Sequence, residues 1–293
     1  MNNIYIVIYM NICIFPGQGK NTFVFDELSN PYFQEIEQVI NIKKNDLLKN
    51  DYPFKYQLLT MIYSLSKIEK IKQIDNDFYK KIDTLMGYSL GEYSALVWGG
   101  SISFKECILL VKKRSELMYN CSLKNESGLI VIIGIKRDFL KIIFKDIKYY
   151  ISIYLSQDGF VCSIKNVDIE VVIKKLNNLK KLNKIFYKRL EVDGGFHSPF
   201  MEECVIPFKD YLKNIDFKEP KIKMVSNYDG EIYRNTDEIK KKLVLHLTHP
   251  IRWDNIIKKH AKEVHNIYEI GGNQLKKTLM LNNIDISNYK FIE

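Results

Sequence analysis

Short apolar runs alternate with amphipathic stretches along most of the chain. The run "NICIF" at residues 11–15 leads into the loop "PGQGK", and the run "IDTLM" at residues 82–86 follows a segment with helical spacing at residues 52–68. A second helical pattern covers residues 103–121. Short buried strands that alternate with helices are typical of an α/β fold with a parallel sheet. We therefore predict an α/β core.

The pattern changes between residues 127 and 192. This segment reads as a strand, a helix, two strands, a helix and a strand, beginning with "GLIVIIGI" and ending with "IFYKRLEV". That order is typical of a small ferredoxin-like unit. The alternative is that these strands extend the main sheet, and we favour the inserted unit. We expect a large catalytic α/β domain made of residues 1–126 and 193–293, with a small subdomain at residues 127–192.

Composition indicates a globular protein kept in a reducing compartment. The 293 residues are 46% hydrophobic, which is enough to bury a large core. The five cysteines are odd in number, widely separated and form no C-x-x-C pair, which argues against a disulfide framework and against a zinc site. We expect a cytoplasmic protein with no bound metal. The cysteines are Cys13, Cys107, Cys121, Cys162 and Cys204.

The apolar N-terminal run "MNNIYIVIYMNICIF" predicts a buried strand. It has no basic region and no A-x-A-like cleavage site, so it does not read as a signal peptide. It is also shorter than the roughly 20 residues that a membrane-spanning helix needs. We expect no membrane attachment. Met10 would be a natural start, which would make residues 1–9 an extension.

The formal net charge of +9 raises the question of a nucleic-acid partner. The lysines are spread along the chain, without the interleaved aromatic residues or the recognised motif of a nucleic-acid binding protein. Abundant Lys, Asn, Ile and Tyr is what AT-rich codons produce, so we expect no nucleic-acid partner. A basic face would still attract an acidic protein or a phosphorylated ligand.

One serine lies in a pattern that produces nucleophiles. Ser89 stands between Gly87 and Gly91, after an apolar run and before a helix-like run. In a G-x-S-x-G elbow, a sharp strand-to-helix turn exposes the serine Oγ, and only glycine tolerates the crowding two residues away. The pattern also arises by chance, and it then marks only a glycine-lined turn.

A serine nucleophile needs a base, and the chain offers five histidines. His260 and His265 lie on or near a Lys-rich helix, where a solvated side chain is expected. His246 and His249 could form a pair, but they have no third metal ligand nearby in the sequence. His197 lies in "VDGGFHSPFM", where a loop ahead of a helix can present a side chain on a rigid scaffold. We therefore select His197 as the candidate base.

Four segments carry a resemblance to one family. They are "FPGQG" (15–19), "GYSLGEYSAL" (87–96), "VKKRSELM" (111–118) and "GGFHSPFM" (194–201), and "SNYDGEIY", "HPIRW" and "YEIGGNQL" follow in the family's order. From about Met10 onward, the chain resembles the malonyl-CoA:acyl carrier protein transacylases and the related acyltransferase domains of polyketide synthases. The resemblance implies a hydrolase-like α/β core with a nucleophile elbow and a small ferredoxin-like subdomain.

The resemblance implies a serine acyltransferase that works in two half reactions. Ser89 would attack the thioester of malonyl-CoA, while His197 accepts its proton and later activates the phosphopantetheine thiol of the carrier protein. The backbone N–H groups of Gln18 and Leu90 would form the oxyanion hole. A backbone carbonyl orients the histidine in this family, and by position in "HPIRW" that carbonyl would belong to Arg252.

Arg114 carries the inference about the acyl group. Malonyl differs from acetyl by a carboxylate, which a buried guanidinium binds bidentately. Read without the resemblance, Arg114 is a surface cation on a lysine-rich helix. Its place in "VKKRSELM" matches the carboxylate-binding arginine of the family. Phe196 resembles the bulky residue of malonyl-selective members, where it leaves little room for an α-methyl branch.

Three features depart from the family's pattern. Tyr88 stands where a histidine usually precedes the nucleophile, Gly272 replaces a proline, and residues 151–164 lack the "AN-N" signature of the small domain. These departures would alter acyl selectivity or carrier docking. The candidate nucleophile, base, oxyanion donors and arginine remain in place.

Taken with the resemblance, the residues imply a malonyl-CoA:acyl carrier protein S-malonyltransferase for fatty-acid or polyketide synthesis. Its partners would be an acyl carrier protein and a CoA thioester, with no bound cofactor, and we expect a monomer. The alternatives are an acyl hydrolase that clears stalled chains from carrier proteins and a catalytically idle docking subunit of a synthase. A hydrolase acting on varied chains gains nothing from a carboxylate clamp. An idle subunit need not keep Ser89 and His197 together.

Overall fold

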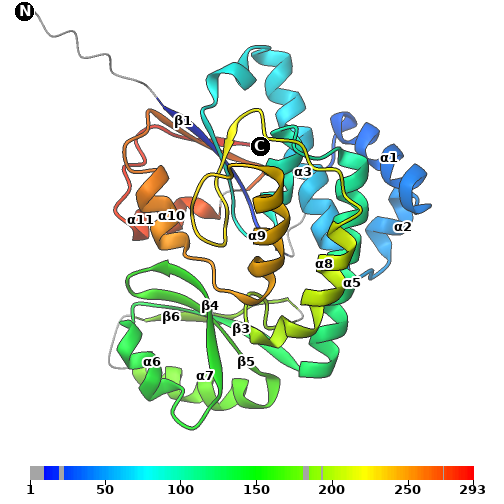
Figure 1. Cartoon of the computed structure of the whole chain (residues 1–293). Coiled ribbons are helices and arrows are strands. Elements are labelled where there is room, and N and C mark those ends of the chain that lie inside the picture. Colours follow the sequence, from blue (N-terminus) through cyan, green and yellow to red (C-terminus); the bar gives the residue numbers. More distant parts are fainter. Residues whose placement is uncertain (1–9, 20–22, 181–184, 193, 273) are drawn as a thin grey trace, which may run out of the picture.

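Two lobes of unequal size make up the protein (Figure 1). The apolar run that predicts an N-terminal strand begins at residue 1, and its first nine residues lie outside the described residues. The strand is present from Asn11 to Phe15. The computed structural model describes residues 10–19, 23–180, 185–192, 194–272 and 274–293.

A parallel sheet of five strands forms the centre of the large lobe. Its strand order is β7-β2-β1-β8-β9, and every neighbouring pair runs in parallel. Parallel neighbours need crossover connections, which helices supply in this lobe. In chain order the strands are β1 (Asn11–Phe15), β2 (Thr84–Gly87), β7 (Lys223–Met224), β8 (Asn266–Ile270) and β9 (Tyr289–Ile292).

The described helices of the large lobe come before and after the chain passes through the small lobe. Three short 3-10 segments, η1 (Glu27–Ser29), η2 (Phe78–Lys81) and η3 (Pro199–Cys204), accompany them. The α-helices are α1 (Asn30–Ile40), α2 (Lys44–Lys49), α3 (Lys55–Ile74), α4 (Gly91–Trp98), α5 (Phe104–Asn125), α8 (Val205–Leu212), α9 (Thr236–Thr248), α10 (Trp253–His260) and α11 (Leu275–Leu281).

Helices cover both faces of the parallel sheet. In β1, Cys13 and Phe15 belong to one buried cluster, whereas Ile12 and Ile14 belong to another, because successive side chains of a strand point to opposite faces. The first cluster includes side chains of α3, α4, α5, α8 and α9, and the second includes side chains of α10 and α11. Burial on both faces explains why β1 reads as a continuous apolar run.

Side-chain caps fix the first turns of two helices that carry site residues. Ser103 Oγ accepts a hydrogen bond of 3.2 Å from the Glu106 N–H at the start of α5. Asn235 Oδ1 accepts one of 2.9 Å from the Glu238 N–H at the start of α9. Such caps satisfy backbone donors that have no partner within the helix.

The small lobe has a sheet of its own. Its order is β4-β5-β3-β6 with all neighbours antiparallel, and α6 and α7 pack against one face through a separate apolar cluster. The predicted fold class, an α/β core with a small ferredoxin-like unit, is therefore confirmed, and these strands do not extend the main sheet. The elements are β3 (Ser127–Ile133), α6 (Arg137–Ile143), β4 (Tyr149–Ser156), β5 (Gly159–Lys165), α7 (Asn166–Lys180) and β6 (Phe186–Arg189).

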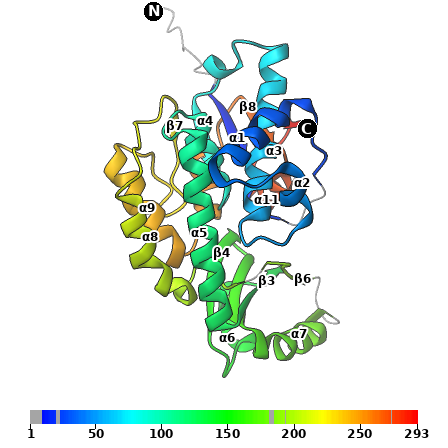
Figure 2. The ribbon, with the colours of Figure 1, turned by 90° about the vertical axis from the view of Figure 1, so that its right-hand side faces the viewer.

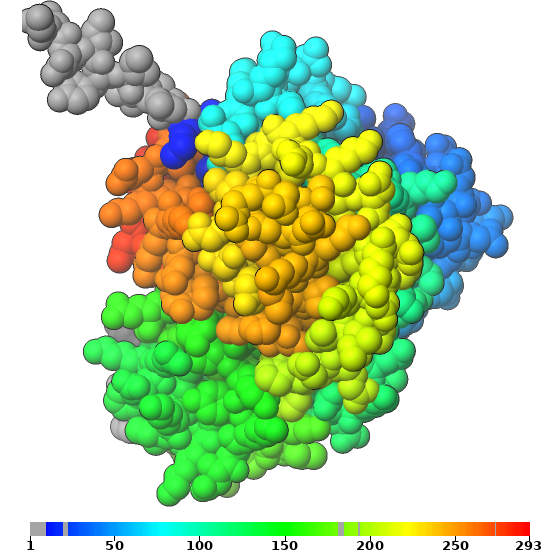
Figure 3. Space-filling model, in the orientation of Figure 1, coloured from blue at the N-terminus to red at the C-terminus, as the bar shows by residue number. Residues whose placement is uncertain are grey.

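The two lobes are joined by a long helix and by hydrogen bonds. Helix α5 runs from the large lobe down to the start of β3 (Figure 2). Backbone hydrogen bonds of 2.9 Å run from Tyr154 N–H to the Ile251 carbonyl and from Ile251 N–H to the Ser152 carbonyl. The yellow-to-orange part of the large lobe, with α8, α9 and α10, rests against the green small lobe (Figure 3). Within the described residues, no helix has the length and apolar character that crossing a bilayer requires.

Candidate active site

The fold brings two loops together at the carboxyl edge of the parallel sheet. β1 and β2 are neighbours, and their last residues, Phe15 and Gly87, lie opposite each other. The loop at 16–19 and the turn at 88–90 therefore start side by side. In open α/β sheets this edge is where ligands bind.

Ser89 forms a nucleophile elbow between β2 and α4. Its φ of 53° is left-handed, a conformation that is strained for a non-glycine residue. A Cβ at Gly87 would lie 2.0 Å from the Glu92 nitrogen, and a Cβ at Gly91 would lie 2.2 Å from the Phe15 oxygen. Both positions therefore require glycine.

His197 lies directly against the serine. Its Nε2 is 2.8 Å from Ser89 Oγ, and its Nδ1 is 2.8 Å from the backbone carbonyl of His246. A carbonyl can only accept, so Nδ1 carries the proton and Nε2 is left to accept the Ser89 proton. His197 is also left-handed, with a φ of 56°. The structure thus brings the two residues selected from separate motifs into one hydrogen-bonded pair.

The assignment of Arg252 as the residue that orients the histidine is wrong. The carbonyl of Arg252 accepts from the Asn255 and Ile256 N–H groups in the first turn of α10. It is therefore committed to the helix, and the carbonyl near the end of α9, that of His246, contacts His197 instead. The Arg252 side chain pairs with Asp254.

Burial makes His197 a base that stays neutral. Its side chain is almost completely buried, and this burial holds its pKa well below the ordinary value. The neighbouring His246 ring, when charged, and the Arg114 guanidinium lower the pKa of His197 in the same direction. The ring is therefore ready to accept a proton near neutral pH.

The two predicted oxyanion donors flank Ser89. Leu90 follows the serine at the start of α4, and Gln18 lies in the loop after β1. That loop approaches closely, because a Cβ at Gly17 would lie 2.9 Å from the Tyr88 oxygen. Neither the Gln18 nor the Leu90 N–H makes a hydrogen bond to another described residue. Both remain available to an oxygen bound beside Ser89.

Arg114 is buried, and no carboxylate of the described residues pairs with it. It is 2% exposed, and its Nη1 donates a hydrogen bond of 2.8 Å to Gln57 Oε1. Its Nε has no hydrogen-bond partner, and it forms no ion pair with any described Asp or Glu. A buried guanidinium without a counter-charge is costly, so an anionic ligand would satisfy it. Arg114 is thus not a surface cation.

A cavity next to these residues has room for a small acyl group. It measures about 380 Å³ and is lined in part by Gln18, Gln57 and Phe196. Phe196 is half-buried and directly precedes His197. A second cavity of about 360 Å³ is lined in part by Gln18 and Tyr88, whose ring packs edge-to-face on Trp253 at 5.0 Å.

The sequence reading did not identify the residues that support the elbow. Ser89 N–H donates to Asn227 Oδ1 at 3.0 Å, and Asn227 Nδ2 donates to the Gly87 carbonyl at 2.7 Å. Asn227 lies in "SNYDGEIY", which was noted only for its place in the motif order. The sequence gives Glu92 of the elbow motif no role and suggests only metal binding for His246, yet both are buried at the site. Among the described residues, no group of three or more His, Cys, Asp or Glu side chains could hold a metal ion.

Known proteins are similar to this chain along most of its length. No protein-family model matches the chain. The malonyl CoA-acyl carrier protein transacylase of Buchnera aphidicola subsp. Schizaphis graminum is 30% identical, over 94% of this chain and 92% of the relative. The chain belongs to the malonyl CoA-acyl carrier protein transacylase family. The polyketide biosynthesis malonyl CoA-acyl carrier protein transacylase PksC of Bacillus subtilis is 27% identical, over 87% of this chain and 90% of PksC.

Solved structures of the transacylase family share the fold. The Helicobacter pylori malonyl-CoA:acyl carrier protein transacylase aligns with a TM-score of 0.82 and 20% identity, over 97% of this chain and 94% of the other. A malonyl-transacylase in complex with its type II polyketide synthase acyl-carrier protein aligns with a TM-score of 0.81 and 22% identity, over 96% and 94%. The two-lobed architecture is therefore that of the transacylase family.

Proposed function

We propose that the chain moves a malonyl group from CoA to the phosphopantetheine thiol of an acyl carrier protein, through an acyl-enzyme on Ser89. The observation that carries this proposal is the Ser89–His197 pair, 2.8 Å apart, in a site that also holds a buried guanidinium with no carboxylate partner among the described residues. The first feature supports acyl transfer, and the second supports an acyl group with a terminal carboxylate.

The first half reaction loads the serine. As Ser89 Oγ bonds to the thioester carbonyl carbon, its proton passes to His197 Nε2, and the carbonyl oxygen becomes an oxyanion. The N–H groups of Gln18 and Leu90 would hold that oxygen, and one such donor contributes about 3 kcal/mol. The carbon–sulfur bond then breaks, and the CoA sulfur leaves with the proton that His197 returns.

The second half reaction repeats these steps with a different thiol. The phosphopantetheine thiol gives its proton to His197 Nε2 while its sulfur attacks the serine ester. The ester bond then breaks, and Ser89 Oγ takes the proton back. The His246 carbonyl keeps the imidazole oriented through both halves, because it accepts from Nδ1 and leaves Nε2 facing Ser89. This scheme needs no cofactor or metal.

Transfer fits the site better than either alternative. An editing hydrolase that accepts varied acyl chains has no use for the buried charge of Arg114, and an idle subunit has no use for the strained turn that holds Ser89 against His197. We place the reaction in the cytoplasm, in line with five cysteines that are all free. The proposal covers fatty-acid and polyketide synthesis alike.

Mixing the protein with malonyl-CoA and then with a holo carrier protein tests the function. Intact-protein mass spectrometry should detect a malonyl adduct on the chain after the first addition, and its movement to the carrier after the second. Loss of the adduct to water at the same rate with and without carrier would instead indicate a hydrolase. No adduct at all would indicate a docking subunit.

The pH dependence of loading should follow the low pKa of His197. The base works only when neutral, and because burial holds its pKa well below the usual value, it stays neutral as the pH falls to about 6.5. Rapid-quench measurement of the first turnover at saturating malonyl-CoA should give a flat rate between about pH 8 and 6.5, with the decline only at lower pH. A midpoint at or above 6.5 would contradict this expectation.

Three basic side chains of the small lobe line cavities that reach the site. Arg137 and Lys141 of α6 line a cavity of about 570 Å³ that also includes His197. Lys188 of β6 lines the cavity that includes Tyr88 and Gln18. We propose that this small-lobe rim attracts an acidic carrier protein and the phosphates of CoA.

Salt should slow the encounter with the carrier and leave the chemistry unchanged. Between about 0.01 and 0.15 M ionic strength, the Debye length falls from about 30 to about 8 Å. Steady-state kinetics should therefore show a decrease in kcat/KM for the carrier, while the rate of Ser89 loading at saturating malonyl-CoA changes little. A triple Arg137→Ala, Lys141→Ala, Lys188→Ala variant should lose most of this salt dependence. Carrier kinetics indifferent to salt would overturn the proposed role of the rim.

A further inference from the structure

A buried carboxylate and a buried imidazole lie next to the catalytic histidine. The His246 ring stacks on the His197 ring, with centroids 4.4 Å apart and an angle of 14° between the planes. His246 Nδ1 lies 3.1 Å from Glu92 Oε2. The side chains of His246 and Glu92 are 2% and 0% exposed. His197 thus contacts the face of an imidazole whose edge meets a carboxylate.

Other hydrogen bonds fix the Glu92 carboxylate. Its Oε1 accepts from the Tyr233 hydroxyl at 2.7 Å and from the Asn227 N–H at 3.0 Å. Glu92 Oε2 and His246 Nε2 have no hydrogen-bond partner among the described residues. The nearest polar neighbour of Glu92 Oε2 among the described residues is therefore His246 Nδ1.

One protonation state explains both of these atoms. A buried carboxylate oxygen without a donor is costly, and the nearest candidate donor is His246 Nδ1, 3.1 Å away. A proton on His246 Nε2 would be a buried donor without an acceptor, which is also costly. The His246 tautomer that avoids both costs carries its proton on Nδ1, the ring nitrogen that lies beside Glu92.

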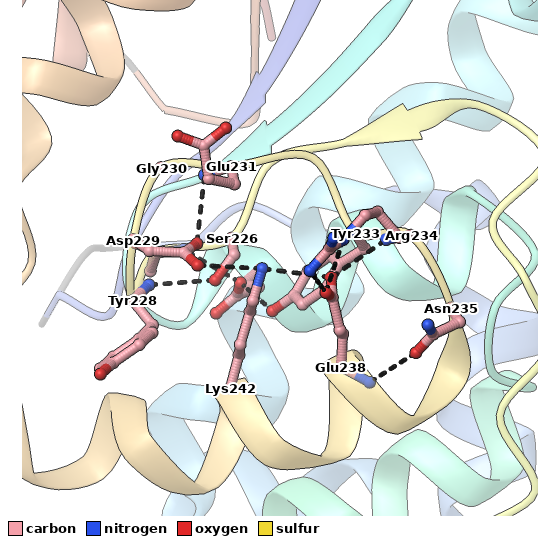
Figure 4. A network of polar contacts seen from close by, with 12 residues as sticks. Ser226, Tyr228, Asp229, Gly230, Glu231, Tyr233, Arg234, Asn235, Glu238 and Lys242 are labelled. Atoms are coloured by element: carbon pink, nitrogen blue, oxygen red, sulfur yellow. Dashed lines mark hydrogen bonds and ion pairs between the residues drawn. The ribbon is translucent and has the colours of Figure 1, made fainter.

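The surrounding groups leave the charge of Glu92 uncompensated. Lys242, one turn before His246 on α9, lies 3.0 Å from Asp229 and 3.3 Å from Glu238 (Figure 4). These two carboxylates balance the charge of Lys242. Burial raises the pKa of Tyr233, and of Tyr93 on α4, so both stay neutral. From α5, the Arg114 guanidinium has no described carboxylate partner and is reserved for the substrate.

We propose that Glu92 and His246 form a positioning pair that stabilises the imidazolium formed on His197 during malonyl transfer. This inference rests on the proposed function, because the pair acts when His197 holds the proton of Ser89. A fixed negative charge one stacked imidazole ring away from a developing positive charge, among buried side chains, favours the charged state without reorganisation. The family's orienting carbonyl belongs to His246 here, so one residue both orients His197 and couples it to Glu92.

Nitrogen NMR of the full chain tests the arrangement without any catalysis. In protein labelled with 15N-histidine, the neutral His246 ring should carry its proton on Nδ1 and not on Nε2. The His246→Gln variant assigns the signals. Glu92→Gln should abolish this tautomer preference. A neutral His246 ring with its proton on Nε2 in the parent protein would overturn the proposal even if malonyl transfer is confirmed.

Kinetics tests what the pair does for the reaction. Glu92→Gln should lower the rate of Ser89 loading about ten- to a hundredfold, with the KM for malonyl-CoA within about twofold. His246→Gln keeps the backbone carbonyl and should lose about tenfold. Glu37→Gln on α1 and His260→Gln on α10 are matched controls that should load at the parental rate, since neither side chain belongs to the site.

The two measurements distinguish the positioning role from a structural one. If Glu92 only stabilises the fold, its variant should melt at a lower temperature while the folded fraction loads at the parental rate, and that result would overturn the proposal. Should Glu92→Gln fail to fold, the parental NMR and His246→Gln still decide. If the parent shows the expected tautomer but no malonyl adduct, the proposed function fails and the pair has no imidazolium to stabilise.

Discussion

Replacing Ser89 with alanine should abolish the malonyl adduct that malonyl-CoA leaves on the protein. In the proposed mechanism Ser89 Oγ is the nucleophile and lies 2.8 Å from His197 Nε2, so removing it leaves the base with no proton to accept. The backbone turn is kept, since alanine and serine have the same Cβ at a left-handed φ. Intact-protein mass spectrometry should show the full adduct in the parent and none in the variant.

Ser94→Ala is the matched control for this prediction. Ser94 lies on α4, is buried, and its Oγ has no hydrogen-bond partner among the described residues. Its variant removes a hydroxyl close in sequence to the elbow without touching His197, so it should load like the parent. An undiminished adduct in Ser89→Ala would place the nucleophile on another residue and overturn the mechanism.

The sequence predicted features that depend on local chemistry. The α/β class follows from short apolar strands between helices, and the elbow from glycines at positions where a Cβ would collide with backbone atoms. The separate small lobe also followed from its element order. Each of these properties is encoded in neighbouring residues, so one sequence is enough to read it.

Features that depend on how distant elements meet were harder to predict. Arg252 was chosen by its place in a motif, but the carbonyl of a residue at a helix start is used by that helix, and position alone cannot show this. His246 was interpreted as ordinary because its neighbours in the sequence suggest no site. Its role arises only when α9 packs against α4 and against the loop that carries His197.

The role of Arg114 could not be predicted from its neighbours in the sequence. In the sequence it is one cation among several on a lysine-rich segment, and only the resemblance suggested a ligand. In the structure Lys112, two residues earlier on α5, pairs with Glu116. Arg114 instead faces inward, to Gln57 and the Tyr93 ring. A guanidinium buried in this way, without a described carboxylate, points to an anion that arrives with the substrate.

Arg114→Ala should therefore cost malonyl loading far more than acetyl loading. A charge-assisted hydrogen bond contributes about 1.5 to 3 kcal/mol, so the malonyl rate should fall roughly ten- to a hundredfold relative to the acetyl rate. Arg114→Lys should recover only part of the preference, because an ammonium keeps the charge but loses the planar pair of donors. Competition between malonyl-CoA and acetyl-CoA, followed by mass spectrometry of the Ser89 adducts, measures this ratio directly.

Lys113→Ala is the control for that comparison, since it removes a cation from the same helix without reaching the buried site. Its ratio of malonyl to acetyl loading should equal that of the parent. Thermal melting adds an independent readout: loading with malonyl should raise the Tm of the parent, because the carboxylate satisfies Arg114, and this increase should disappear in Arg114→Ala. Equal losses for malonyl and acetyl, together with a lower Tm of the unloaded protein, would instead assign Arg114 to the fold and leave acyl selectivity to the cavity beside Phe196.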